Sequence, residues 1–126
     1  NDVVVVGRMR TRERSGEEDL MLNFLKKLNF NVLKIKKGFL EGGDVICVDE
    51  ETLIVGYGNR TDEEGISEMS NYFQASIHRF QLDNRFVHLD LCMNLIDENT
   101  LLVATEIKGA VRAINEIKKF DVIYTG

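Results

Sequence analysis

The sequence predicts an α/β fold built from repeated units, each made of two strands, a helix and a further strand. Runs of β-branched and apolar residues alternate along the chain with amphipathic segments of helical period. The segments VDEETLIV at 48–55 and IDENTLLV at 96–103 share five of eight residues at an offset of 48. Self-similarity at a period of this length is typical of repeat architectures. We therefore expect two complete ββαβ units and the back part of a third.

The first, partial unit is expected to contain a strand, a helix and a second strand. The β-branched run at 3–7 is typical of a buried strand, and the alternation of apolar and polar residues at 31–36 indicates another. Residues 16–28 predict a helix, with acids at its start and lysines towards its end. Four apolar residues share one face of this helix: Leu20, Phe24, Leu25 and Leu28.

The second unit begins with a predicted hairpin, in which strands at 44–48 and 52–56 flank an acidic turn. A helix is predicted at 61–73 with Asp62 as its N-cap, because a carboxylate there can accept from the free backbone N–H groups of the first turn. The residues of this helix that we expect to face inward are Ile66, Met69 and Phe73. A strand at 76–80 completes the unit.

The third unit repeats this order, with strands near 89–96 and 100–105, a helix at 109–119 and a final strand at 121–124. A single unit cannot bury both faces of its sheet, so neighbouring units must cover it. The expected units, within one partial domain over 1–126, span about 1–36, 40–80 and 88–126. The assembly is unfinished by this count, and we expect the chain to be a piece of a longer protein.

Composition limits the classes of function. The 126 residues include 16 Lys or Arg and 21 Asp or Glu, for a net charge of −5, whereas a general nucleic-acid binder needs a basic face. No apolar run approaches the roughly 18 residues of a membrane-spanning helix, so neither nucleic acid nor membrane is an expected partner. Two cysteines, Cys47 and Cys92, are too few for a disulfide scaffold and indicate a reducing, cytoplasmic setting.

The repeat also predicts where a functional site lies. At the offset of 48, the strand start at 40–44 corresponds to the one at 88–92, and equivalent strand ends in a ring of repeats point towards one shared axis. Four polar side chains are expected to meet there: Glu41, Asp44, His88 and Asp90. Carboxylates beside a histidine can hold a cation and move protons near neutral pH. The adjacent Gly42 and Gly43 permit close backbone approach or a positive φ. Three acids without a second histidine or a cysteine ligand disfavour a transition-metal site.

Three motifs carry a resemblance to a known family: LEGGDV at 40–45, GYGNRT at 56–61 and HLD at 88–90. In this order and spacing they resemble the guanidino-group-modifying enzymes, which include arginine deiminase, dimethylarginine dimethylaminohydrolase and the amidinotransferases. The resemblance covers nearly the whole chain. It implies a pentein-like α/β propeller of ββαβ repeats, of which this chain would hold about two and a half of five units.

The resemblance implies a catalytic role for three residues at the substrate guanidinium. Glu41 would hold the guanidinium, and Asp90 would bind a second edge of it, as in arginine deiminase. His88 would protonate the leaving amine and then activate water. Dimethylarginine hydrolases tend to carry a different residue at the position of Asp90, so Asp90 favours the deiminase.

Two arginines are implied to bind the other end of the substrate. Arg60 matches the arginine that pairs with the substrate α-carboxylate, a bidentate contact suited to a guanidinium. Arg14, three residues before Glu17, resembles the other arginine at that carboxylate. Asp44 would lie behind the residues that touch the substrate and support their binding of it.

The implied function is hydrolysis of the guanidinium carbon–nitrogen bond of arginine through a covalent cysteine intermediate. The family's nucleophilic cysteine lies well beyond the HLD motif, and neither Cys47 nor Cys92 matches it. We expect the thiol to come from a missing C-terminal segment of the same protein or from another chain, and this chain alone to be inactive. No cofactor or metal is implied, because the histidine and the thiol cover the chemistry. Exposed sheet edges favour association into a homo-oligomer.

Alternatives stay open at the level of function and of single residues. The activity could instead be dimethylarginine hydrolysis or amidino transfer, or the chain could be a non-catalytic binding protein of the same fold. Structural interpretations of the candidate residues are a surface acid for Glu41, a core histidine for His88, turn caps for Asp44 and Asp90, an ion pair with the helix start at 62–64 for Arg60, and a solvated basic loop for Arg14.

Overall fold

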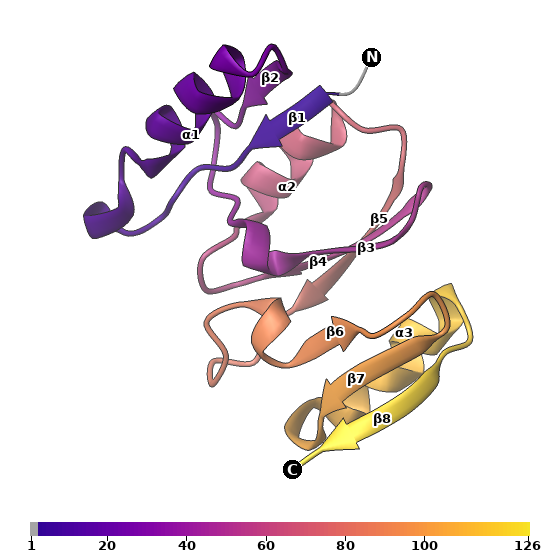
Figure 1. Ribbon diagram of the computed structural model, residues 1–126. Helices are drawn as coiled ribbons and strands as arrows, with labels where there is room; N and C mark the ends of the chain where they lie inside the picture. Colours follow the sequence, from indigo (N-terminus) through magenta and orange to yellow (C-terminus); the bar gives the residue numbers. More distant parts are fainter. Residues whose placement is uncertain (1–2) are drawn as a thin grey trace.

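The computed structural model describes residues 3–126, in which three separate β-sheets follow one another along the chain (Figure 1). The first sheet pairs β1 (Val3–Val6) with β2 (Asn31–Lys34). The second is built from β3 (Val45–Asp49), β4 (Thr52–Tyr57) and β5 (Ser76–Gln81). The third is built from β6 (Met93–Leu95), β7 (Thr100–Ala104) and β8 (Asp121–Thr125). One helix follows the middle or opening strand of each sheet: α1 (Glu17–Lys27), α2 (Glu63–Ser70) and α3 (Val111–Ile117).

The second and third sheets share one topology. In each, an antiparallel hairpin is followed by a helix and by a strand that lies parallel to the second strand of the hairpin. The parallel register begins at Thr52 opposite Ser76 in one sheet and at Thr100 opposite Asp121 in the other. The predicted ββαβ order is therefore confirmed. The offset of 48 relates equivalent residues of the two hairpins, whereas the final strands are offset by 45 residues, from Ser76 to Asp121.

Helix α2 follows the predicted N-cap, Asp62, and ends at Ser70, three residues before the predicted end at 73. The Asp62 side chain accepts a hydrogen bond from Gly65 N at 2.8 Å, which makes it the N-cap. Ile66 and Met69 are buried, and Phe73 packs against them at the edge of the cluster. This cluster also contains two residues of the connection between β2 and β3, Ile35 and Leu40, and two residues of β4, Leu53 and Val55. Helix α2 thus lies between the first and second sheets (Figure 1).

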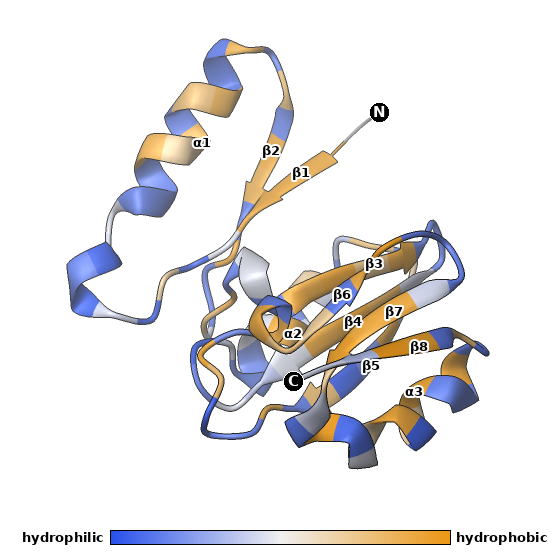
Figure 2. Cartoon of the chain, turned by 60° about the horizontal axis from the view of Figure 1, so that its bottom comes forward, coloured by the Kyte–Doolittle hydropathy of each residue, from blue (hydrophilic) through white to orange (hydrophobic). Residues whose placement is uncertain are grey.

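A larger cluster joins the second sheet to the third. Ile54 of β4 is buried in the same cluster as Leu101 of β7 and Ile114 of α3. The strands that supply these residues carry the apolar stretches seen in Figure 2. Because α3 also lies between two sheets, the two complete units form one continuous core.

The structure differs from the predictions at two elements of the third unit. The strand expected at 89–96 is divided into a 3₁₀ turn, Leu89–Leu91, and the short strand β6. The backbone N–H of Leu89 donates to the Asp44 side chain at 2.9 Å instead of to a neighbouring strand, so the extended ladder begins later. The helix expected at 109–119 is preceded by a 3₁₀ segment, Thr105–Ala110, and its α-helical part begins only at Val111.

Helix α1 carries an exposed apolar face. Leu20, Phe24 and Leu28 are 74%, 57% and 52% exposed, although they share the face that the sequence pattern identifies. Leu25 is half-buried and lies beside β1. In Figure 2 the helix stands with the β1–β2 pair, apart from the other two sheets. Within residues 3–126, no helix is long and apolar enough to cross a membrane.

Candidate active site

The candidate site is built around the buried carboxylate of Glu41, which is 1% exposed. Glu41 lies between β2 and β3, immediately before the 3₁₀ turn Gly42–Asp44. A backbone bridge between Arg8 and Leu40, with N–O distances of 2.8 and 3.1 Å, holds this segment against the chain that leaves β1. The Glu41 backbone N–H donates to Thr61 Oγ1 at 3.1 Å, which fixes the residue from the side of α2.

Three basic side chains meet the Glu41 carboxylate. Arg14 Nη1 lies 2.9 Å and His88 Nε2 lies 3.1 Å from Oε1, and Arg60 Nη1 lies 3.7 Å from Oε2. The three come from different segments: the loop after β1, the loop after β4 and the loop after β5. Four of the six residues singled out in the sequence are therefore in direct contact.

Asp44 joins the turn that carries Glu41 to the turn that carries His88. Its side chain is buried, accepts from Thr61 Oγ1 at 2.6 Å and accepts from Leu89 N at 2.9 Å. Burial raises the pKa of Asp44 above its usual value, although both hydrogen bonds act in the opposite direction. Its partners lie 17 and 45 residues away, and one of them is the first residue of the 3₁₀ turn Leu89–Leu91, so Asp44 caps a turn distant in sequence.

Asp90 lies at the exposed rim of this group. A Cβ atom at Gly43 would come within 3.0 Å of Asp90 Oδ2 and 3.1 Å of His88 Cγ. Glycine at residue 43 lets the turns bearing Glu41 and His88 approach this closely without displacing these side chains. The sequence predicts either a close backbone approach or a positive φ at Gly42 and Gly43. The structure has the close approach, at Gly43.

The contacts of Arg60 differ from those of an ion pair with the start of α2. Two of the acids at the start of α2 have other partners: Asp62 accepts from Gly65 N and Phe39 N, and Glu63 pairs with Arg79 at 3.6 Å. Arg60 instead reaches Glu41 and donates to Thr11 Oγ1 at 3.5 Å. Its position is that of a residue directed into the site.

Neither cysteine is placed to act as the nucleophile. Cys92 is buried, and burial together with nearby carboxylates raises the pKa of its thiol to about 11. Cys47 is exposed on β3, beside an apolar hollow lined by Leu53, Met69 and Phe73. Among residues 3–126, no group of three His, Cys, Asp or Glu side chains could hold a metal ion.

Two residues of the site were not singled out as functional by the sequence analysis. Thr61 bridges Glu41 and Asp44 through its hydroxyl, and its position inside the GYGNRT motif was the available signal. Glu17 binds the guanidinium of Arg14 through both carboxylate oxygens, and its spacing of three residues from Arg14 was the signal in that case.

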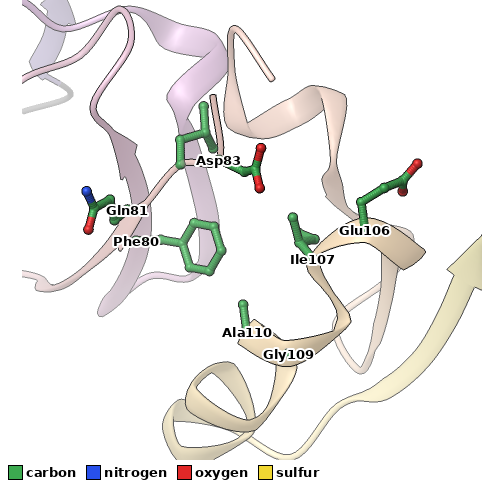
Figure 3. Close-up of a pocket in the computed structure, with 8 residues that line it drawn as sticks. Phe80, Gln81, Asp83, Glu106, Ile107, Gly109 and Ala110 are labelled. Carbon is green, nitrogen blue, oxygen red and sulfur yellow. The ribbon is translucent and has the colours of Figure 1, made fainter. Parts of the chain in front are cut away.

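A separate hollow of about 370 Å³ lies between the end of β5 and the segment 105–110 (Figure 3). Phe80 and Ile107 face one another across it, and Asp83 and Glu106 lie on one side. Arg85 donates to Asp83 at 2.9 and 2.8 Å and lowers the pKa of that carboxyl to about 2. None of the described residues that line this hollow is basic, so it does not share the chemistry of the Glu41 group.

Comparison with known sequences identifies the family. The family described as arginine deiminase matches residues 1–122. The chain belongs to this family, and with it to the guanidino-group-modifying superfamily. It is 35% identical to the uncharacterized protein ZK1307.1 of Caenorhabditis elegans over 108 residues, which are 81% of this chain and 38% of that protein. It is 29% identical to the dimethylarginine dimethylaminohydrolase of Mycobacterium tuberculosis, over 80% of this chain and 33% of the relative.

Solved structures establish the fold. The N-terminal domain of ArgZ, an arginine dihydrolase of the ornithine–ammonia cycle in cyanobacteria, matches 98% of this chain with a TM-score of 0.83 at 24% identity. A DDAH from Pseudomonas aeruginosa, in complex with citrulline, matches 98% with a TM-score of 0.79 at 21% identity. The predicted pentein-like α/β fold of ββαβ repeats is confirmed. This chain spans 48% of each of those solved chains and about two fifths of the curated relatives.

Proposed function

We propose that the protein to which this chain belongs hydrolyses the guanidinium carbon–nitrogen bond of arginine or a close analogue. The chain supplies the guanidinium-binding and proton-transfer half of the site. One observation carries the proposal: a guanidinium already rests on the buried Glu41 carboxylate, with His88 on the same oxygen. Arg14 Nη1 and His88 Nε2 lie 2.9 and 3.1 Å from Oε1. A substrate guanidinium that takes the place of Arg14 would meet both groups that the reaction requires.

The reaction assigns a separate task to each residue. A cysteine thiolate attacks the guanidinium carbon and forms a carbon–sulfur bond, while Glu41 and Asp90 hold the guanidinium nitrogens. The carbon–nitrogen bond then breaks, and His88 gives a proton to the departing ammonia. Water attacks the amidino carbon as His88 takes its proton, the carbon–sulfur bond breaks, and citrulline leaves. Asp44 acts behind this group, because it holds the turn that presents His88.

The thiolate is the part that this chain does not place. Cys92 is buried with a raised pKa, and Cys47 lies on the exposed face of β3. We therefore propose that a segment outside these 126 residues, or another chain, supplies the nucleophile, and that this chain alone does not turn over arginine. Two unpaired cysteines fit a reducing compartment such as the cytoplasm.

Dimethylarginine is the second candidate substrate. The observation that favours it is the likeness to the dimethylarginine dimethylaminohydrolase of Mycobacterium tuberculosis. The exposed Asp90 carboxylate favours unsubstituted arginine. A carboxylate there can accept a hydrogen bond from a free terminal nitrogen of the guanidinium, whereas a dimethylated nitrogen has no N–H to donate. Arg60 has the fork to pair with an α-carboxylate in either substrate.

The proposal is tested with the longer protein that contains this chain. We expect citrulline formation from arginine, and a smaller kcat/KM for agmatine, which lacks the α-carboxylate. The Arg60→Ala variant should bind arginine more weakly by roughly 2–5 kcal/mol, as when one partner of a buried charge pair is removed. Its kcat/KM for arginine should fall towards its kcat/KM for agmatine. Citrulline from dimethylarginine but not arginine would favour the second candidate. Absence of turnover of both would favour a non-catalytic binding protein.

A further inference from the structure

Glu17 makes a paired contact with Arg14 that is separate from the Glu41 contact. Arg14 Nε lies 3.1 and 3.2 Å from the two Glu17 oxygens, and Arg14 Nη2 lies 2.9 Å from Oε2. The remaining nitrogen, Nη1, is the one that reaches Glu41 at 2.9 Å. The two acids therefore occupy different edges of one planar guanidinium.

We propose that Glu17 is a positioning residue, which keeps Arg14 at the mouth of the site when substrate displaces Arg14 from Glu41. The inference rests on the proposed function, because it assumes that a substrate guanidinium binds Glu41. A guanidinium offers five N–H donors in a fixed fork. Glu17 binds the Nε–Nη2 edge and leaves Nη1 as the donor for the substrate α-carboxylate. When the exposed Arg14 and Glu17 side chains rotate together, Arg14 changes one partner and keeps the other.

The Glu41 side chain is buried, whereas its partner Arg14 and the second acid, Glu17, are partly exposed. The Glu41 side chain is 2% exposed, whereas the side chains of Arg14 and Glu17 are 40% and 49% exposed. Without Glu17, an arginine released from Glu41 would have solvent as its main partner and would lose its fixed orientation. Holding a long, flexible side chain in one rotamer before the ligand arrives reduces the entropy cost of binding. The contribution of Glu17 is therefore expected in substrate affinity.

Glu17 also lies in the first turn of α1, where any acid favours the helix dipole. Asp19 is a matched control for that structural role. It lies in the same turn, its side chain is exposed, and it pairs with Lys34 at 2.5 Å instead of with a residue of the site. Loss of negative charge at either position should affect the helix similarly, and each substitution also removes one ion pair, so the two differ in that the partner of Glu17 is a residue of the site.

The test uses the longer protein that contains this chain, with the variants Glu17→Gln, Glu17→Asp and Asp19→Asn. Steady-state kinetics with arginine and agmatine are measured together with thermal unfolding of each variant. We expect Glu17→Gln to raise KM for arginine about tenfold, because a charge-assisted contact is lost, with kcat nearly unchanged. KM for agmatine should stay the same, since agmatine has no carboxylate for Arg14. Glu17→Asp should recover part of the affinity, and Asp19→Asn should match the wild type.

Three outcomes would overturn the inference. Equal KM values for Glu17→Gln and Asp19→Asn would show that the Arg14 contact does not act on the substrate. Equal increases for arginine and agmatine would identify a general structural role. A wild-type protein that turns over neither arginine nor dimethylarginine would overturn the proposed function itself, and with it this role of Glu17.

Discussion

The first unit of the chain and the two later units carry the same repeat but are buried very differently. Helix α2 packs Ile66 between the first and second sheets, and α3 packs Ile114 between the second and third. Helix α1 has the β1–β2 pair on one side, and its Leu20 and Phe24 are exposed. Within residues 3–126, that pair also lacks the antiparallel strand that β3 and β6 supply to the other sheets.

The difference shows that a helix of this repeat buries its apolar face where the sheets of two units lie on either side of it. Each buried helix has its own sheet on one side and the preceding sheet on the other. A helix with a single sheet leaves part of its apolar surface in water. Each Å² of that surface would contribute about 25 cal/mol to stability if it were buried. The site also forms where units meet, because Glu41 lies on the connection from the first sheet to the second and His88 lies on the connection from the second sheet to the third.

The largest effect that tests this comparison is on the stability of this chain. Leu101 is fully buried in the core that joins the second and third sheets, whereas Leu20 is 74% exposed on α1. We expect Leu101→Ala to reduce the free energy of unfolding by about 2–5 kcal/mol, and Leu20→Ala to change it by no more than about 0.5 kcal/mol. Urea denaturation of the two variants measures both. Similar losses would show that α1 is covered in solution.

The second prediction concerns the Thr61 hydroxyl, which joins the Glu41 turn to the loop before α2. Thr61 is buried and bonds both Asp44 and Glu41, whereas the Thr100 hydroxyl donates to the exposed Asp97. Thr61→Val leaves a buried carboxylate oxygen and a backbone N–H without partners, so we expect a loss of about 1–3 kcal/mol. Thr100→Val should cost about 0.5 kcal/mol or less. Equal losses in urea denaturation would contradict the importance of the buried contact.

The smallest effect is a difference in pH dependence between a buried and an exposed acid. The pKa of Asp44 is raised, so its folded form binds the proton more tightly, and its contribution to stability falls as pH rises from 3.8 to the raised value. The pKa of Asp83 is lowered to about 2, so its contribution is present above 3.8 and is lost as pH falls towards 2.

Unfolding curves between pH 2 and 6 for the wild type, Asp44→Asn and Asp83→Asn measure the contributions of these two carboxyl groups to stability. The stability advantage of the wild type over Asp44→Asn should shrink with rising pH, and its advantage over Asp83→Asn should grow. The same slope for both variants would show that Asp44 is not desolvated in solution.

The order of elements and the meeting of the site residues could be predicted from sequence because both follow from the repeat. The offset of 48 relates the β3–β4 hairpin to the β6–β7 hairpin, and it places Glu41 and His88 at equivalent connections. The motifs around Glu41, Arg60 and His88 then indicated the chemistry. The repeat spacing alone could not assign that chemistry, because a fold does not determine its function.

The parts that could not be predicted depend on contacts distant in sequence. The strand expected to begin at Leu89 starts instead with a turn, because its N–H is bonded to Asp44, 45 residues earlier. An amphipathic pattern identifies the apolar face of α1 but not whether a second sheet covers it. The contact of Arg14 with Glu41 depends on the backbone bridge between Arg8 and Leu40, which no local pattern reveals.

The two histidines of the chain provide the most direct test of the account. His88 Nε2 lies 3.1 Å from the buried Glu41 carboxylate, whereas His78 lies on β5, paired in register with Ile54. In the longer protein, His88→Asn should lower kcat for citrulline formation from arginine by about 10²- to 10⁴-fold, the usual contribution of a general acid–base group. His78→Asn should leave kcat within about twofold of the wild type, because a substitution away from the reacting groups removes no such step. Wild-type activity in His88→Asn, or an equal loss in both variants, would contradict the assignment of this site.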